Sequence, residues 1–173
     1  MQIRPAQRED AAAIARIHVA AWQAAYAGII DAGYLAALST AQRETYWAQA
    51  IAQGRPGLLL AQDGDGAVTG WIAFGDCRDT DAPATRGEIW AIYVDPTCWS
   101  QGAGQALWRH ARERLLEQGK TEASLWVLAA NQRAIRFYKA LDFAPDPGSD
   151  RTITVAGARI DEVRQICPLA RGG

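Results

Sequence analysis

The segment of residues 89–109 constrains the fold more than any other part of the chain. An apolar run rich in β-branched and aromatic residues ends at Pro96, and two glycines, Gly102 and Gly104, then precede an amphipathic segment. This order predicts a strand, a glycine-containing turn and the first turn of a helix. Because the first backbone N–H groups of a helix have no partner within it, such a turn is suited to binding phosphate.

The spacing of these glycines argues against two other phosphate-binding motifs. A Walker A loop needs Gly-Lys-Ser/Thr, whereas Gln105 and Ala106 follow the second glycine here. A dinucleotide fingerprint needs a third small residue, so that the helix can pack closely on the strand, and Leu107 occupies that position. From this segment alone, a purely steric role of the glycines in a strand-to-helix turn stays open as the alternative.

Composition favours a single soluble domain that spans residues 1–173. Hydrophobic residues make up 49% of the chain and charged residues 21%, as in ordinary globular domains. The formal net charge is −1 and Lys and Arg do not cluster, which argues against nucleic acid or a membrane surface as a partner. No apolar run approaches the roughly 20 residues that span a bilayer. Three scattered cysteines and two histidines match no metal-ligand spacing, so we expect no metal and a reducing cytoplasm.

Hydrophobic periodicity and turn signals predict the order of the elements. Helices are expected at residues 11–26, 31–38, 40–53, 102–118 and 132–140. Strands are expected at residues 2–4, 57–62, 68–74, 87–94, 122–128, 152–155 and 159–167. The Asp-Gly pairs at 63–66 predict a hairpin turn between the second and third of these strands.

Three motifs resemble the GCN5-related N-acetyltransferase (GNAT) family. Tyr-Val-Asp-Pro at 93–96, followed by Gln-Gly-Ala-Gly-Gln-Ala-Leu at 101–107, is similar to the family's acetyl-CoA pyrophosphate loop. Asn-Gln-Arg-Ala-Ile-Arg-Phe-Tyr at 131–138 is similar to its Asn-x-x-Ala-x-x-Phe-Tyr signature. Trp-Gln-Ala-Ala-Tyr-Ala-Gly at 22–28 resembles a subset of bacterial members. One departure is Asp142, where the family usually has glycine, but Asp tolerates the left-handed conformation better than most residues.

The resemblance implies a mixed α/β fold with acetyl-CoA as the cofactor. We expect a central, mostly antiparallel twisted sheet of six to seven strands, flanked by helices and splayed between the fourth and fifth strands. The splay would leave a slot for the thioester. The residues that the resemblance assigns to the cofactor are Ile92, Tyr93, Val94, Gln101, Gly102, Ala103, Gly104, Gln105, Asn131 and Tyr138.

The reaction that the resemblance implies is direct attack of a primary amine, on a small molecule or a peptide N-terminus, on the acetyl thioester. The Val94 amide would polarise the thioester carbonyl. Tyr138 is the expected general acid, and Glu88, in the central strand, is the expected base, acting through water. A non-catalytic acyl-CoA-binding sensor is the alternative function.

Four aromatic residues come from segments expected to border the acceptor: Trp22, Tyr26, Trp71 and Trp90. An aromatic cleft suits an apolar or cationic substrate. Packing in the core is the alternative explanation for each of them. No motif identifies the acceptor, and a homodimer is expected only by analogy, because many relatives dimerise.

Overall fold

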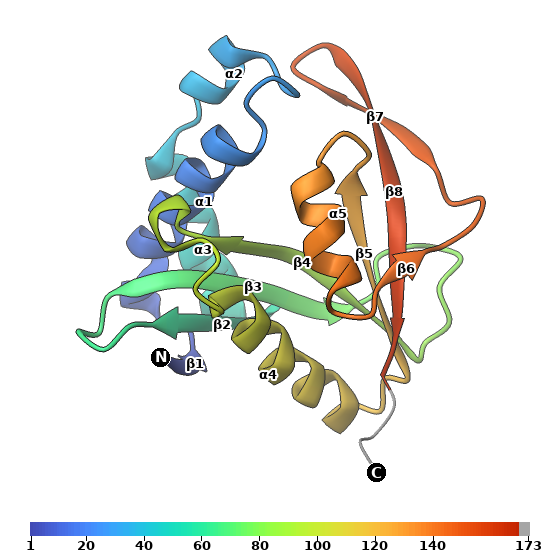
Figure 1. Ribbon diagram of the computed structural model, residues 1–173. Coiled ribbons are helices and arrows are strands. Elements are labelled where there is room, and N and C mark those ends of the chain that lie inside the picture. Colours follow the sequence, from blue (N-terminus) through green and yellow to red (C-terminus); the bar gives the residue numbers. More distant parts are fainter. Residues whose placement is uncertain (170–173) are drawn as a thin grey trace.

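A twisted sheet of eight strands organises the molecule (Figure 1). The computed structural model describes residues 1–169, and the strands follow the order β1-β2-β3-β4-β5-β8-β6, with β7 also paired to β8. The strands are β1 (Gln2–Pro5), β2 (Gly57–Gln62), β3 (Val68–Asp76), β4 (Arg86–Val94), β5 (Glu122–Leu128), β6 (Ala144–Pro145), β7 (Arg151–Val155) and β8 (Ala158–Pro168). The helices are α1 (Ala11–Ala25), α2 (Ala32–Ala36), α3 (Thr40–Gln53), α4 (Ala103–Glu117) and α5 (Gln132–Lys139).

The predicted fold class is confirmed, with one strand more than expected. The additional strand is β6, which is two residues long and pairs with β8. A segment this short has no detectable periodicity, so only its partner strand reveals it. All the strand pairs are antiparallel except β4 with β5.

Side chains of β2 and β3 are buried on both faces of the sheet. Successive residues of a strand point to opposite faces. Leu59 and Ile72 therefore pack in the cluster that contains α4, whereas Leu60 and Trp71 pack in the cluster that contains α1 and α3. Figure 1 shows α1 and α4 on opposite sides of these strands. Burial on both faces explains why both strands read as nearly continuous apolar runs.

Local chemistry sets several helix ends where the sequence predicts them. Asn131 precedes α5 and accepts a hydrogen bond from the Ala134 amide at 3.1 Å, as a capping residue does. Asp142 adopts a φ of 66°, which confirms that it can replace glycine after α5. Asp10 precedes α1, but its carboxylate binds Arg4 and the Gln7 amide and makes no capping bond to α1.

The strands β4 and β5 separate after a short region of pairing. Their parallel register covers three residue pairs, the last of which is Glu88 with Ser124. Each strand is held on its outer edge, β4 by β3 and β5 by β8, along almost its whole length. Figure 1 shows β5 and β8 running across the direction of β3 and β4. The predicted splay between the fourth and fifth strands is therefore confirmed.

Candidate active site

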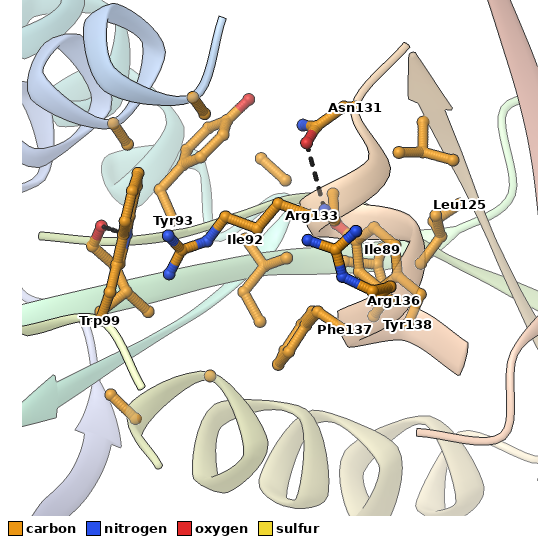
Figure 2. Close-up of a pocket in the computed structure, with 18 of the residues that line it drawn as sticks. Ile89, Ile92, Tyr93, Trp99, Leu125, Asn131, Arg133, Arg136, Phe137 and Tyr138 are labelled. Carbon is orange, nitrogen blue, oxygen red and sulfur yellow. Dashed lines mark hydrogen bonds between the residues drawn. The ribbon is translucent and has the colours of Figure 1, made fainter. Parts of the chain in front are cut away.

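The separation of β4 and β5 opens a cavity of about 640 Å³ (Figure 2). It is lined by residues 89–94 of β4, residues 125–127 of β5, the turn before α4, and one face of α5. Nine of the ten residues expected to bind the cofactor line this cavity. The exception is Gln101, which is exposed and donates a side-chain hydrogen bond to the Thr97 carbonyl at 3.3 Å.

The backbone of β4 presents donors to this cavity. The Asp95 amide donates to the Thr69 carbonyl at 2.8 Å, and the N–H direction alternates along a strand. In the same register, the N–H groups of Ile92 and Val94 point away from β3 and toward the gap beside β5. The Val94 carbonyl faces this side too, since it accepts a hydrogen bond from the Trp99 indole at 2.9 Å. An extended ligand could therefore pair with β4 as an added strand.

The turn before α4 presents a second set of donors. Ser100 and Gly102 both adopt left-handed conformations, with φ values of 63° and 87°. The Ala106 amide makes an intrahelical bond to the Gly102 carbonyl, so the N–H groups of residues 103–105 precede the first such bond. These three residues line the cavity. Their amides and the helix dipole favour an anion there.

The two glycines of this turn have different roles. Gly102 needs its positive φ, and a Cβ built on it would meet nothing within 4 Å. A Cβ on Gly104 would lie 2.8 Å from the Cζ atom of Phe137. The small size of Gly104 therefore allows α4 and α5 to approach each other, and this packing, rather than room for a phosphate, explains the residue.

Two arginines of α5 also line the cavity, although no role was predicted for them. Arg133 and Arg136 lie about one turn apart and face it from the same helix. Figure 2 shows Arg133 reaching toward Trp99, and its guanidinium carbon lies 3.5 Å from the centroid of that ring. Their i, i+3 spacing within the 131–138 motif could have indicated that both side chains lie on one face of the helix. Together with the α4 amides, they favour a ligand that carries phosphate groups.

Tyr138 both packs on the core and lines the cavity. Its ring contacts those of Phe137 and Phe143, with centroids 5.3 and 5.9 Å away. Burial, and to a smaller extent the neighbouring Tyr93, raises the pKa of the Tyr138 phenol well above its ordinary value. At neutral pH this phenol is therefore protonated and can donate a hydrogen bond or a proton.

A smaller cavity of about 190 Å³ adjoins the first one. Both cavities are lined by Tyr26, Ile89, Trp90, Tyr93 and Trp126, so they share a wall. The other residues around the smaller cavity come from α1 and the segment that follows it, the loop of residues 77–85, and the strands β4, β5, β7 and β8. The structure thus places a second, partly aromatic compartment beside the larger one.

Glu88 is buried at the edge of the smaller cavity, with 2% of its surface exposed. Its Oε2 atom accepts a hydrogen bond from the Arg78 amide at 2.8 Å, and both of its oxygens accept bonds from the Arg78 guanidinium. That guanidinium also lies over the Trp90 ring, 4.4 Å from its centroid. The carboxylate of Glu88 therefore already has several donors, which attach the loop of residues 77–85 to β4.

Three of the four aromatic residues expected near the acceptor line the smaller cavity. They are Trp22, Tyr26 and Trp90, and the Trp22 indole donates to the Tyr93 hydroxyl at 2.8 Å. Trp71 is not placed there. It has 0% of its surface exposed, and its indole donates to the Ile14 carbonyl at 3.1 Å. The alternation of β3 points Trp71 to the face that α1 and α3 cover, so it belongs to the core.

The fold and the cavity together define a class of protein, and comparison with known families agrees. The family model described as "Acetyltransferase (GNAT) family" matches residues 12–143. The chain belongs to this family, which confirms the predicted family and its enzyme class, an acyl-CoA-dependent N-acetyltransferase. Within residues 1–169, no helix is both long and apolar enough to cross a membrane.

Curated relatives cover most of the chain. The N-acetyltransferase YuaI of Bacillus subtilis (strain 168), described as uncharacterized, is 34% identical over 161 residues, covering 93% of this chain and 89% of the relative. An uncharacterized N-acetyltransferase of Archaeoglobus fulgidus is 30% identical over 156 residues, covering 86% of this chain and 97% of the relative.

Solved structures share the fold at lower identity. A phosphinothricin acetyltransferase from Sinorhizobium meliloti, in complex with acetyl-CoA, has a TM-score of 0.74 and 23% identity, covering 99% of this chain and 89% of the other. The PaiA N-acetyltransferase from Thermoplasma acidophilum, in complex with coenzyme A, has a TM-score of 0.73 and 20% identity, covering 93% of this chain and 96% of the other.

Proposed function

We propose that the protein transfers an acetyl group from acetyl-CoA to the primary amine of a small molecule or of a peptide N-terminus, by direct attack of the amine. One observation carries this proposal, namely the row of donors along the larger cavity. The row runs from the amides at the start of α4, with Arg133 and Arg136, to the N–H groups of Ile92 and Val94 on β4. It suits a ligand with phosphates at one end and an amide-containing arm at the other.

Acetyl-CoA, when bound, supplies a thioester with an electrophilic carbonyl carbon, and the reaction releases the CoA thiol. The amides of residues 103–105 and the two arginines would hold the phosphates, and β4 would align the arm. The Val94 N–H is the donor that we assign to the thioester oxygen, where negative charge develops during attack.

Tyr138 is the proton donor that we assign to the leaving thiolate. Its phenol is protonated at neutral pH, and it lines the same cavity as Val94. A positioned acid of this kind typically contributes about 10²–10⁴-fold to the rate. The smaller cavity is the site that we assign to the amine, because it shares a wall with the larger one.

Glu88 stays a weaker candidate for the base, acting through water. It lines the amine cavity, which supports the role, but Arg78 already binds both of its carboxylate oxygens. Attack requires a neutral amine, so some group on this side must accept a proton.

The test is release of CoA thiol from acetyl-CoA in the presence of a library of primary amines. Tyr138→Phe should lower kcat by about 10²-fold and leave the Kd for CoA unchanged, because it removes one proton and little volume. Tyr46→Phe is the matched control, since Tyr46 is 51% exposed on α3 and lines neither cavity.

Two outcomes would contradict the proposal at different points. Tight CoA binding without thiol release across the library would favour a sensor over a transferase. Equal turnover by wild type and Tyr138→Phe would remove Tyr138 from the mechanism while leaving acetyl transfer intact.

A further inference from the structure

The smaller cavity contains a second carboxylate, Glu162, which sequence patterns did not single out. It lies on β8, and its side chain is 13% exposed. The cavity is therefore lined by two acidic residues, Glu162 from the far half of the sheet and Glu88 from β4. An amine bound in this cavity could be contacted by either carboxylate.

The two carboxylates differ in how many donors they already have. Glu88 accepts hydrogen bonds on both oxygens, all from Arg78. Glu162 accepts one from the Nε atom of Arg151, at 2.9 Å and on Oε2. Within residues 1–169, the side chain that binds Glu162 is that of Arg151, and it binds Oε2. The Oε1 atom is therefore available to a ligand. A carboxylate in this state can accept another donor without giving up its ion pair.

Glu162 also lies beside the wall that the two cavities share. Glu162, Tyr26 and Tyr93 all line the smaller cavity. Burial is the main cause that raises the pKa values of the two tyrosines, and the charge of Glu162 makes a small further contribution. These two tyrosines line both cavities. A group bound between Glu162 and these hydroxyls would therefore be next to the compartment that we assign to the thioester.

The charged side chains that line the smaller cavity are paired with one another. From β7, Arg151 binds Glu162 and lies over the Trp126 ring, 3.6 Å from its centroid. In the loop of residues 77–85, Arg78 binds Glu88, and Asp79 accepts a hydrogen bond from the Trp126 indole. Each arginine is thus held by its own carboxylate and stacked on its own ring. The remaining lining is aromatic or aliphatic, which suits the apolar body of a small amine.

We infer that Glu162 binds the ammonium group of the acceptor and takes the proton that must leave before attack. This inference rests on the proposed acetyl transfer. One ammonium N–H bond breaks, the proton passes to Oε1 of Glu162, and the nitrogen keeps the electron pair. That pair forms the new C–N bond as the C–S bond of the thioester breaks. The thiolate takes the Tyr138 proton, and the second proton lost by nitrogen restores that phenol.

The acceptor class that follows is a small primary amine with an apolar or aromatic body. Its ammonium would lie at Glu162, and its body against the tryptophans and the aliphatic residues Ile153 and Val155. A cavity of about 190 Å³ is small, which favours a compact molecule.

The experiment uses the full chain with acetyl-CoA and phenethylamine as the probe, followed by CoA thiol release between acidic and alkaline pH. Glu162→Gln should lower kcat/KM about 10²–10³-fold near neutral pH. In this variant, the logarithm of kcat/KM should rise with pH up to the pKa of the amine, because only amine already neutral in solution reacts. Wild type should show a much flatter profile there.

Asp161→Asn is the matched control. Asp161 is the neighbouring exposed carboxylate of β8, it accepts a hydrogen bond from Thr152, and it lines neither cavity. This variant should keep the wild-type profile. A merely structural role of Glu162 predicts an equal loss at every pH, so the shape of the profile separates the two roles.

Two other kinds of result would contradict the assignment of Glu162. A wild-type profile for Glu162→Gln, or a rising profile for Glu88→Gln in its place, overturns the inference and leaves acetyl transfer standing. If wild type binds CoA but acetylates neither phenethylamine nor any other amine in the library, acetyl transfer fails first, and the assignment of Glu162 fails with it.

Discussion

His18 shows at the scale of one residue how surroundings decide chemistry. It is buried on α1 between the rings of Trp22, Trp47, Trp71 and Tyr93. The Trp47 indole donates to its Nδ1 at 3.2 Å, so a neutral ring carries its proton on Nε2, which has no hydrogen-bond partner within residues 1–169. Burial, and to a smaller extent a nearby arginine, lowers the pKa of His18 to about 3.

This shift predicts a loss of stability in acid. Between about pH 6.5 and about pH 3, the unfolded chain binds a proton at His18 that the folded chain does not, so the free energy of unfolding falls as pH falls. The slope from this one group is at most about 1.4 kcal/mol per pH unit. In urea titrations across this range, His18→Phe should be less stable than wild type near neutrality, because Trp47 loses its acceptor, yet should lose less stability in acid. An equal fall in the free energy of unfolding with falling pH in the two proteins would refute this prediction.

At the scale of an element, β4 combines two functions along its two edges. One edge completes the sheet with β3, and the other presents amides to the cavity. The alternation of a single strand is enough to produce this division, because successive N–H groups point in opposite directions. The splay of β5 then leaves the inner edge without a partner strand.

This division predicts which amides of β4 exchange with solvent. In the protein without ligand, the N–H groups of Ile92 and Val94 should exchange quickly, whereas that of Tyr93 should be protected by its bond to β3. Saturation with CoA should slow exchange at Ile92 and Val94 and change Tyr93 little. Residue-resolved hydrogen exchange by NMR is the measurement. Slow exchange at Val94 without CoA would show that its amide is already bonded.

At the scale of the whole molecule, two halves of the sheet meet around the cavity. The contacts that join the strands β1–β4 to the strands β5–β8 include three residue pairs and one core cluster. In that cluster, Leu107 of α4 lies with Ile72 from the first half and Leu125 from the second. A ligand in the cavity therefore contacts both halves and should stabilise them together.

We accordingly expect CoA to raise Tm. At a free concentration about 100 times its Kd, a ligand adds about 2.7 kcal/mol, which for a domain of this size is roughly 5–11 °C. Gly102→Glu should lose this increase, because it puts a strained, negatively charged residue at the phosphate turn. Calorimetric scans of wild type and of Gly102→Glu, each with and without CoA, measure the increase in Tm of both proteins. An undiminished increase in Gly102→Glu would place the phosphates elsewhere.

Much of the architecture could be predicted from sequence because its signals are local. Apolar periodicity, Asp-Gly turns and capping residues each act within a few positions, so most predicted elements lie within one or two residues of the observed ones. The motifs at 101–107 and 131–138 likewise identified the turn before α4 and Tyr138. Local patterns were therefore enough to predict the family, the order of the elements and most of the residues that line the larger cavity.

Contacts between side chains far apart in the chain could not be predicted from local patterns. Arg164 binds Asp79, Asp81 and Asp146, and so holds the loop of residues 77–85. The burial of Trp71 and the position of Glu162 beside the tyrosines likewise depend on the register of strands far apart in the chain. A shift of one residue in register would send each side chain to the opposite face, and no local pattern encodes that choice.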